Sequence, residues 1–527
     1  MGPRRPVEVC ATNNSWLSDE GMAGQSLKEA SIRGGAVTMA SQGCKFALQL
    51  GSMFLLGRLL TPGDFGLVAM VTALTAFVLL FRDSGLSTAT IQQPHITQQQ
   101  VNSLFWVNAG IGLLAMLGTM ALAPAVAWFY KEPRLGAIVA VSSTGLFIGG
   151  LGVQHQALLS RRLRFKALAV ADTASTLLAA AAAVVAALAG LRYWALVIMQ
   201  ITLLSSYALV CWIACSWRPS MPQLHPEAMP MLRFGKNLTG FSVLNYFARN
   251  LDNVLIGHVW GPVQLGFYAK AYQLLLLPLG QLNSPMQSVA LPALSRLQHE
   301  PERYRAAYIS AIRLLGLVTM AMTGYMLVTA DWLIPFILGA QWRPAVGMYR
   351  WLAITGLLQP IANSTGWLFM SQGRGRDMFR WSIISTVLIV GSILGALPFG
   401  ATAVAASYSL TTALVVSPLL FWFVTRRGPV RMGDFYGTLW LPGFATAVAA
   451  MGVHAFRLAT PIFTPLPGIA ATGSLWILLY LGTLACIPSG RAALREIETL
   501  VRSRFPSARP HRLAVETTEA PCASPSS

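Results

Sequence analysis

The sequence predicts an all-α polytopic membrane protein with about fourteen transmembrane helices, and three observations carry this prediction. The chain has 527 residues, of which 54% are hydrophobic and only 11% are charged, against about 25% charged in an ordinary soluble domain. Its mean hydropathy is +0.56. Apolar runs of about 20 residues recur along the whole chain, and each can cross a hydrocarbon core about 30 Å thick.

The predicted spans follow one another with short connections, and their edges are uncertain by a few residues. They cover residues 34–58, 64–82, 104–129, 135–158, 167–189, 192–216, 235–258, 263–290, 307–329, 346–370, 380–398, 401–425, 438–457 and 468–487. We group them into an N-lobe, a cytoplasmic linker, a C-lobe and an extra helix pair, at residues 34–216, 217–234, 235–425 and 438–487. Residues 1–33 form a cytoplasmic N-terminal segment and 488–527 a polar tail, predicted to be disordered.

The loops differ sharply in basic residues. Of the 38 Lys and Arg, 28 lie on one side of the membrane with both termini, seven lie on the other side and three lie inside spans. Because basic loops stay in the cytoplasm, both termini are predicted to be cytoplasmic. The net charge of +19 reflects this bias and attraction to anionic membrane lipids, and needs no nucleic acid. No signal peptide precedes the first span, and either Met1 or Met22 could be the start.

The sequence of one short predicted helical hairpin occurs twice in the chain. Residues 55–69 read LLGRLLTPGDFGLVA and residues 255–269 read LIGHVWGPVQLGFYA, with five identities at an offset of 200. That offset spans six helices, an even number, so both copies have the same orientation in the membrane. We interpret this as a parallel repeat of two six-helix lobes, as in two-lobed transporters. The alternative is a generic Pro/Gly turn with chance identities.

Enzyme chemistry is not predicted. The longest outer loop, residues 330–350, is too short to hold an outer catalytic domain, and the chain has no Walker A, HExxH or GxSxG motif. The six cysteines show no metal-binding spacing and no disulfide framework. We therefore expect no metal and no cofactor. The aromatic residues Trp332, Trp342, Tyr349 and Trp351 read as an interfacial belt.

Charges deep in predicted spans are the candidate functional residues, because such charges are costly in a membrane. The bases are Lys45, Arg249 and Lys270, and the only acid of similar depth is Asp252. Asp252 and Lys270 are each nine residues from Gly261, so they could pair across the hairpin.

Polar neighbours extend these positions into stripes. Asn245, Arg249, Asp252 and Asn253 share a face of one span, and Lys45, Gln49 and Ser52 form the matching stripe of the first. One interpretation is a cationic central cavity for an anionic group such as a lipid pyrophosphate, with Asp252 as a coupling residue. The other is a structural ion cluster. Arg82 and Asp83 end the second span, as a helix cap or as an inner gate.

Several stretches together resemble the polysaccharide flippases of the MOP superfamily. They are SLKEASIRGGAVTMASQ, GRLLTPGDFGLVAM, FRDSGLSTATIQQ, LDNVLIGHVWGPVQLGFYAKAYQLLLLPL and LPALSRLQHEPERYR. The resemblance covers about residues 26–430 and is to the Wzx-type lipopolysaccharide and exopolysaccharide exporters, similar to the colanic acid exporter.

The resemblance implies a two-lobed bundle in the bacterial inner membrane that flips undecaprenyl-pyrophosphate-linked oligosaccharide repeat units. It implies alternating access, with Lys45, Arg249 and Lys270 as cavity residues. A proton or sodium ion as coupling ion, a polysaccharide polymerase and a chain-length regulator are candidate partners.

Three other functions stay open. A MATE-type drug or cation antiporter would need deep acidic residues, where this chain has basic ones. A lipid II flippase fits the span number and the cationic cavity equally well. A membrane-embedded polymerase or transferase is disfavoured by the short outer loops.

Overall fold

The computed structural model describes residues 27–82, 87, 90, 91, 96–222, 229–460 and 465–495. Across these residues every regular element is a helix and none is a strand. The all-α prediction is therefore confirmed. Ten of the helical segments are long and apolar enough to cross a membrane, so the protein is a multi-pass membrane protein. The exact number of fourteen spans stays a prediction.

The helices of the first half follow the predicted spans closely. They are α1 (Leu27–Leu59), α2 (Pro62–Arg82), α4 (Gln98–Ala121), α5 (Ala123–Tyr130), α6 (Arg134–Arg161), α7 (Phe165–Leu188) and α8 (Trp194–Ala214). The predicted span 104–129 is divided between α4 and the short α5, which has a proline in its first turn. Proline fits there because the first helical N–H groups have no partner within the helix.

The second half begins with one long element. The element α9 (Met229–Arg296) is interrupted at Gly261, whose φ of 77° and ψ of −179° are not helical. Its two halves, 229–260 and 262–296, correspond to the predicted spans 235–258 and 263–290. Pro262 begins the second half as Pro62 begins α2. The repeated sequence thus folds into two helical hairpins, α1–α2 and the two halves of α9.

The remaining helices complete the bundle. They are α10 (Pro301–Val328), α11 (Ala330–Leu338), α12 (Ala345–Ser371), α13 (Gly375–Ala396), α14 (Ala401–Thr411), α15 (Ser417–Thr425), α16 (Met432–Ala459) and α17 (Pro465–Cys486). A short 3₁₀ turn, Ala340–Trp342, follows α11. The predicted span 401–425 is α14 and α15 joined by a π-helical turn, Thr412–Val416. Pro418 in α15 explains this irregular turn, because a proline cannot donate the regular helical hydrogen bond.

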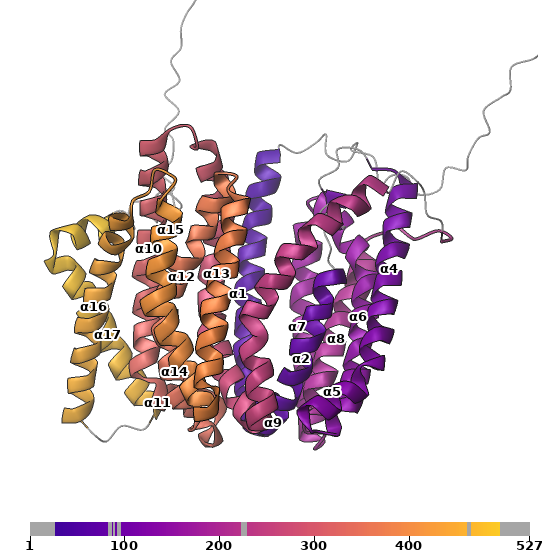
Figure 1. Ribbon diagram of the computed structural model, residues 1–527, viewed down its shortest axis with the longest axis horizontal. Coiled ribbons are helices and arrows are strands. Elements are labelled where there is room, and N and C mark those ends of the chain that lie inside the picture. Colours follow the sequence, from indigo (N-terminus) through magenta and orange to yellow (C-terminus); the bar gives the residue numbers. More distant parts are fainter. Residues whose placement is uncertain are drawn as a thin grey trace, which may run out of the picture.

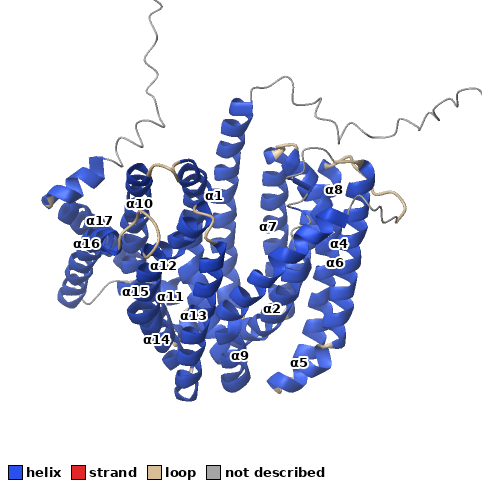
Figure 2. Ribbon diagram, turned by 45° about the horizontal axis from the view of Figure 1, so that its top comes forward, coloured by secondary structure: helices blue, strands red, loops and turns tan. Residues whose placement is uncertain are grey.

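Figure 1 shows how the helices are arranged. The group α2 and α4–α8 lies at one side, the group α10–α17 lies at the other, and α1 and α9 stand between them (Figures 1 and 2). The pair α16 and α17 forms the outer edge, against α10. The short helices α5 and α11 and the turn of α9 lie at the same end of the bundle, at the bottom of Figure 1.

Candidate functional site

The two hairpins cross each other through a reciprocal contact. A Cβ atom added to Gly66 would overlap the carbonyl oxygen of Pro262, and one added to Gly266 would overlap the carbonyl oxygen of Pro62. Each copy therefore contacts the other through the same pair of positions, as in a two-fold symmetric interface. Only glycine permits this approach of one helix to the start of the other. This packing explains why Pro62 and Gly66 recur as Pro262 and Gly266.

A second pair of repeated glycines makes room for the short helices. A Cβ on Gly57 would lie 3.1 Å from the Cα of Leu338, the last residue of α11. A Cβ on Gly257 would lie 3.0 Å from Cε1 of Tyr130, the last residue of α5. Each hairpin thus receives the short helix of the opposite half of the chain.

Hydrogen bonds close this end of the bundle around the first hairpin. The indole N–H of Trp342 and the side-chain amide of Gln341 each donate to the carbonyl of Gly57 at 2.8 Å. Arg58 donates to the carbonyl of Phe336 at 2.8 Å. The interfacial role expected for Trp342 and Tyr349 is wrong, because both side chains are fully buried. The hydrophobicity of residues 330–350 does not distinguish a segment at the membrane interface from one that packs on α1, as this segment does.

The second hairpin is also attached to a short helix of the opposite half, through fewer hydrogen bonds. His258 stacks on Phe129 of α5 with ring centroids 4.3 Å apart, and its Nδ1 lies 2.8 Å from the carbonyl oxygen of Phe129. Both hairpin ends are therefore tied to the opposite half at the same end of the molecule.

Lys45, predicted as a deep base in the first span, has an acidic partner. Its Nζ lies 3.0 Å from Oδ1 of Asp172 on α7, and both side chains are partly exposed. Asp172 is not among the residues predicted from the sequence. In the structure Asp172 lies roughly two turns inside α7, which packs against α1. The available signal was one carboxylate in an otherwise apolar span.

The predicted pair between Asp252 and Lys270 is wrong. The buried carboxylate of Asp252 accepts a hydrogen bond of 2.7 Å from the hydroxyl of Tyr268 and one of 2.8 Å from the N–H of Asn253. Residues two apart on a helix point about 200° apart, so Tyr268 and Lys270 face different ways. Matching depth in the hairpin was not enough to bring Lys270 to Asp252.

Lys270 finds other neighbours. Its Nζ donates to Oε1 of Gln273 at 2.8 Å and lies 4.1 Å from the ring centroid of Phe65 on α2. A cation over an aromatic face is attracted to it without losing its charge. Among the described residues no carboxylate lies in salt-bridge range of Lys270, so its positive charge is not neutralised by an ion pair.

The other predicted site residues are placed less completely. Gln49 and Ser52 lie on α1, where the hydroxyl of Ser52 donates to the carbonyl of Gln49 at 2.9 Å. Asn245, Arg249 and Arg82 lie in helices, but their side chains are outside the described residues, and Asp83 lies outside them entirely. Where the structure describes the chain, no three His, Cys, Asp or Glu residues are grouped to hold a metal ion.

These features define a multi-pass helical membrane protein in which two crossed hairpins join the halves of the chain. The chain belongs to the polysaccharide biosynthesis protein family, whose model matches residues 55–347.

The alignments with three curated relatives extend over most of both sequences. The chain is 26% identical over 433 residues to the Escherichia coli lipopolysaccharide biosynthesis protein WzxC, covering 79% of this chain and 85% of the relative. It is 26% identical to the Bacillus subtilis teichuronic acid biosynthesis protein TuaB, covering 82% and 90%. It is 24% identical to the Rhizobium meliloti succinoglycan biosynthesis transport protein ExoT, covering 88% and 94%.

Solved structures share the fold. The lipid II flippase MurJ in an inward closed conformation superposes with a TM-score of 0.68 at 12% identity, covering 86% of this chain and 98% of that one. A multidrug resistance MATE transporter of the MOP superfamily, in an inward-facing conformation, superposes with a TM-score of 0.55 at 13% identity, covering 76% and 99%. The chain therefore shares its fold with these two proteins.

Proposed function

We propose that the protein flips undecaprenyl-pyrophosphate-linked oligosaccharide repeat units across the bacterial inner membrane, for lipopolysaccharide or exopolysaccharide synthesis. The observation that carries the proposal is the family match over residues 55–347, with relatives named for polysaccharide biosynthesis or transport. The protein moves its substrate without changing a covalent bond, so it is not an enzyme and uses no cofactor.

In this mechanism residues 34–216 and 235–425 act as two lobes that rock about the hairpin crossing. The excess of Lys and Arg on one side puts both termini in the cytoplasm and the crossing at the periplasmic end. The bonds from Trp342 and Arg58 then hold the periplasmic side shut, which supports a state that takes up substrate from the cytoplasmic leaflet.

Lys45, Arg249 and Lys270 provide the positive charge for the pyrophosphate, with Gln49 and Asn245 as polar neighbours. The ion pair of Lys45 with Asp172 supports an exchange, in which substrate phosphate replaces the carboxylate on Lys45. Asp252 is the coupling candidate, for a proton or a sodium ion, and Arg82 and Asp83 are gating candidates at the other end of α2.

The experiment is deletion of the gene in its host, followed by measurement of surface polysaccharide and of lipid-linked repeat units in each leaflet. Loss of polymer with complete repeat units held on the cytoplasmic side is expected. Repeat units that reach the periplasm unpolymerised would indicate a polymerase. An unchanged polysaccharide profile would contradict the proposal and direct the search to drug export or lipid II.

Complementation of the deletion strain then tests the site. A hydrogen bond to a charged group is worth about 1.5–3 kcal/mol, so Lys45→Ala or Arg249→Ala should reduce export roughly tenfold or more. Arg249→Lys should restore part of it, since the charge is kept and the bidentate geometry is lost. Arg376→Ala, an exposed base on α13, is the matched control. Normal export by both alanine variants would refute the cationic cavity.

A further inference from the structure

A groove lies between the last turn of α10, the start of α11, the first turns of α12 and the last turns of α16. Its volume is about 800 Å³. It is lined by Leu327, Val328, Trp332, Arg350, Ala450, Met451, His454, Arg457 and Leu458. Nothing in the proposed flipping mechanism uses these residues.

The groove has an apolar wall and a basic end. The α16 residues Ala450, His454 and Arg457 recur at the spacing of one helix face, so this face turns toward the groove. Met451 and Leu458 beside them are strongly exposed, at 65% and 72%. An exposed apolar surface of this kind is normal where a helix meets lipid chains.

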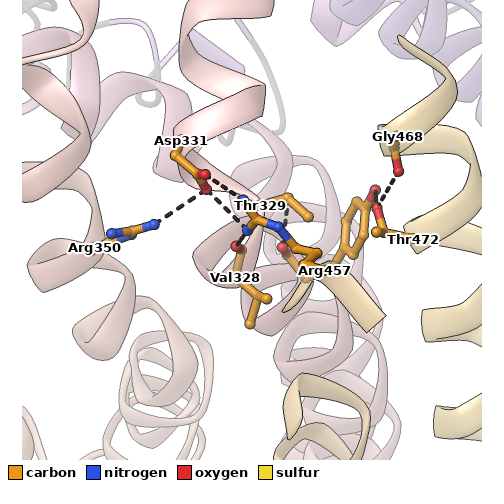
Figure 3. Close-up of polar contacts among 8 residues, drawn as sticks. Val328, Thr329, Asp331, Arg350, Arg457, Gly468 and Thr472 are labelled. Atoms are coloured by element: carbon orange, nitrogen blue, oxygen red, sulfur yellow. Dashed lines mark hydrogen bonds and ion pairs between the residues drawn. The ribbon is translucent and has the colours of Figure 1, made fainter. Parts of the chain in front are cut away.

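The basic end is built around Asp331, as Figure 3 shows. Arg457 donates to both carboxylate oxygens of Asp331 and to the carbonyl of Val328, the latter at 2.6 Å. Its guanidinium also lies 4.0 Å from the ring centroid of Trp332. These contacts occupy the guanidinium of Arg457 and attach the end of α16 to α11.

Arg350 is held far less. It reaches Asp331 through a single bond of 3.2 Å, and half of its side chain is exposed (Figure 3). A guanidinium has five N–H donors in a planar fork, so most of them remain free for a ligand. Arg343, on the same connection but outside the groove, offers a matched comparison.

The charges at this end do not cancel. Burial raises the pKa of the Asp331 carboxyl, but hydrogen bonds from Arg457 and the charges of Arg457 and Arg350 outweigh it, so the pKa lies below its ordinary value. Asp331 is thus ionised at neutral pH, and one carboxylate faces two arginines. No acidic residue is among the described residues that line the groove, so Arg350 and Arg457 with their shared partner Asp331 leave one net positive charge at the rim.

We propose that this groove binds an anionic phospholipid, with its phosphate on Arg350 beside Arg457 and an acyl chain along Leu327, Ala450 and Met451. The charge complementarity and the orientation of the groove carry the proposal. The groove lies at the end of the bundle that holds α11 and the hairpin turns, predicted to be periplasmic, so the lipid comes from the outer leaflet. The proposal does not depend on which substrate is flipped.

The test is lipid binding by the purified full-length protein in a neutral detergent, measured by native mass spectrometry and by the shift in thermal unfolding. We expect phosphatidylglycerol to bind more tightly than phosphatidylcholine. Arg350→Ala should weaken phosphatidylglycerol binding about tenfold, as expected for losing one charge-assisted contact. Arg343→Ala should bind as the unchanged protein does. Equal binding by the two alanine variants would overturn the proposal.

A second variant tests the apolar wall. Ala450→Phe should fill the groove and reduce phosphatidylglycerol binding while leaving the bonds of Arg457 to Asp331 in place. Inorganic phosphate, added in place of the lipid, tests whether the site recognises the anion alone. If it shifts thermal unfolding through Arg350 as strongly as the lipid does, the site recognises a free anion and the lipid proposal is wrong. If Ala450→Phe binds the lipid normally, the acyl chain does not lie in this groove.

Discussion

The two hairpins make the same turn with different chemistry. In the first, Thr61 and Asp64 form reciprocal bonds. The hydroxyl and the N–H of Thr61 donate to Oδ2 of Asp64 at 2.6 Å and 2.9 Å, and the N–H of Asp64 donates to Oγ1 of Thr61 at 3.3 Å. In the second, the positions 200 residues later are Gly261 and Gln264, and Gly261 makes the turn through its φ of 77°. One copy is stabilised by side chains and the other by backbone freedom.

This difference separates what the packing requires from what it tolerates. The second turn has open space at its glycine. A Cβ at Gly261 would meet nothing within 4 Å. The helix starts cannot vary in the same way, because Gly66 and Gly266 each lie against the other copy's proline carbonyl. The identical residues Pro62, Pro262, Gly66 and Gly266 therefore mark the positions where the two copies touch.

The largest effect is expected at the crossing itself. Gly66→Ala and Gly266→Ala each place a Cβ on a backbone carbonyl that cannot rotate away. Overpacking costs about 1–3 kcal/mol even where side chains can adjust, so we expect the upper end of that range or more. We also expect loss of polysaccharide export in the complemented deletion strain.

The control for the crossing is on the same helix. A Cβ on Gly63 would lie 3.5 Å from Cγ2 of Val263, an ordinary contact. Gly63→Ala should therefore unfold at the same temperature as the unchanged protein, or higher, because alanine favours a helix. If Gly66→Ala and Gly63→Ala export equally well, the crossing does not constrain the protein.

A smaller and unequal effect is expected at the second glycine pair. At Gly57 the new Cβ would meet the Cα and carbonyl oxygen of Leu338, at 3.1 Å and 3.2 Å. At Gly257 it would meet only the ends of side chains, including Tyr130 at 3.0 Å. Gly57→Ala should thus lower the free energy of unfolding by about 1–3 kcal/mol, and Gly257→Ala by less than about 1 kcal/mol.

Thermal unfolding of the two variants in one detergent measures this difference. Gly51→Ala, also on α1 with nothing within 4 Å of its Cβ, reports the effect of alanine alone. Equal losses at Gly57 and Gly257 would mean that the α11 backbone yields as readily as a side chain.

The repeat shows how far the sequence could predict this protein. The all-α class, the helix order and the positions of both hairpin turns follow from apolar length and from Pro62 and Pro262. The crossing does not, because no local pattern says which carbonyl a glycine approaches. For the same reason the sequence indicated the turn of each hairpin but not that Trp342 would be buried against Gly57.

The candidate site was less predictable than the fold. Depth along each span identified Lys45, Asp252 and Lys270 as charges far from the span ends, but pairing depends on helix rotation and on neighbouring helices. Asp172 reached Lys45 because α7 packs on α1, and Tyr268 reached Asp252 because it lies on the facing side of its helix. These contacts are set by tertiary packing.

The effects expected at the turns themselves depend on how each turn is made. Losing a side-chain cap costs about 1 kcal/mol, so Asp64→Ala should lower the free energy of unfolding by about that amount. Gln264→Ala, at the matching position, should change nothing measurable, because the second turn uses no cap. Gly261→Ala should cost about 1–2 kcal/mol, since a Cβ is strained at positive φ. Gly261→Asn should cost at least as much, because a φ of 77° with a ψ of −179° lies outside the left-handed helical region that asparagine tolerates and is adopted essentially by glycine alone. Thermal unfolding ranks the four variants by their loss of stability. An equal loss of stability in Gln264→Ala and Asp64→Ala would show that both turns are capped alike.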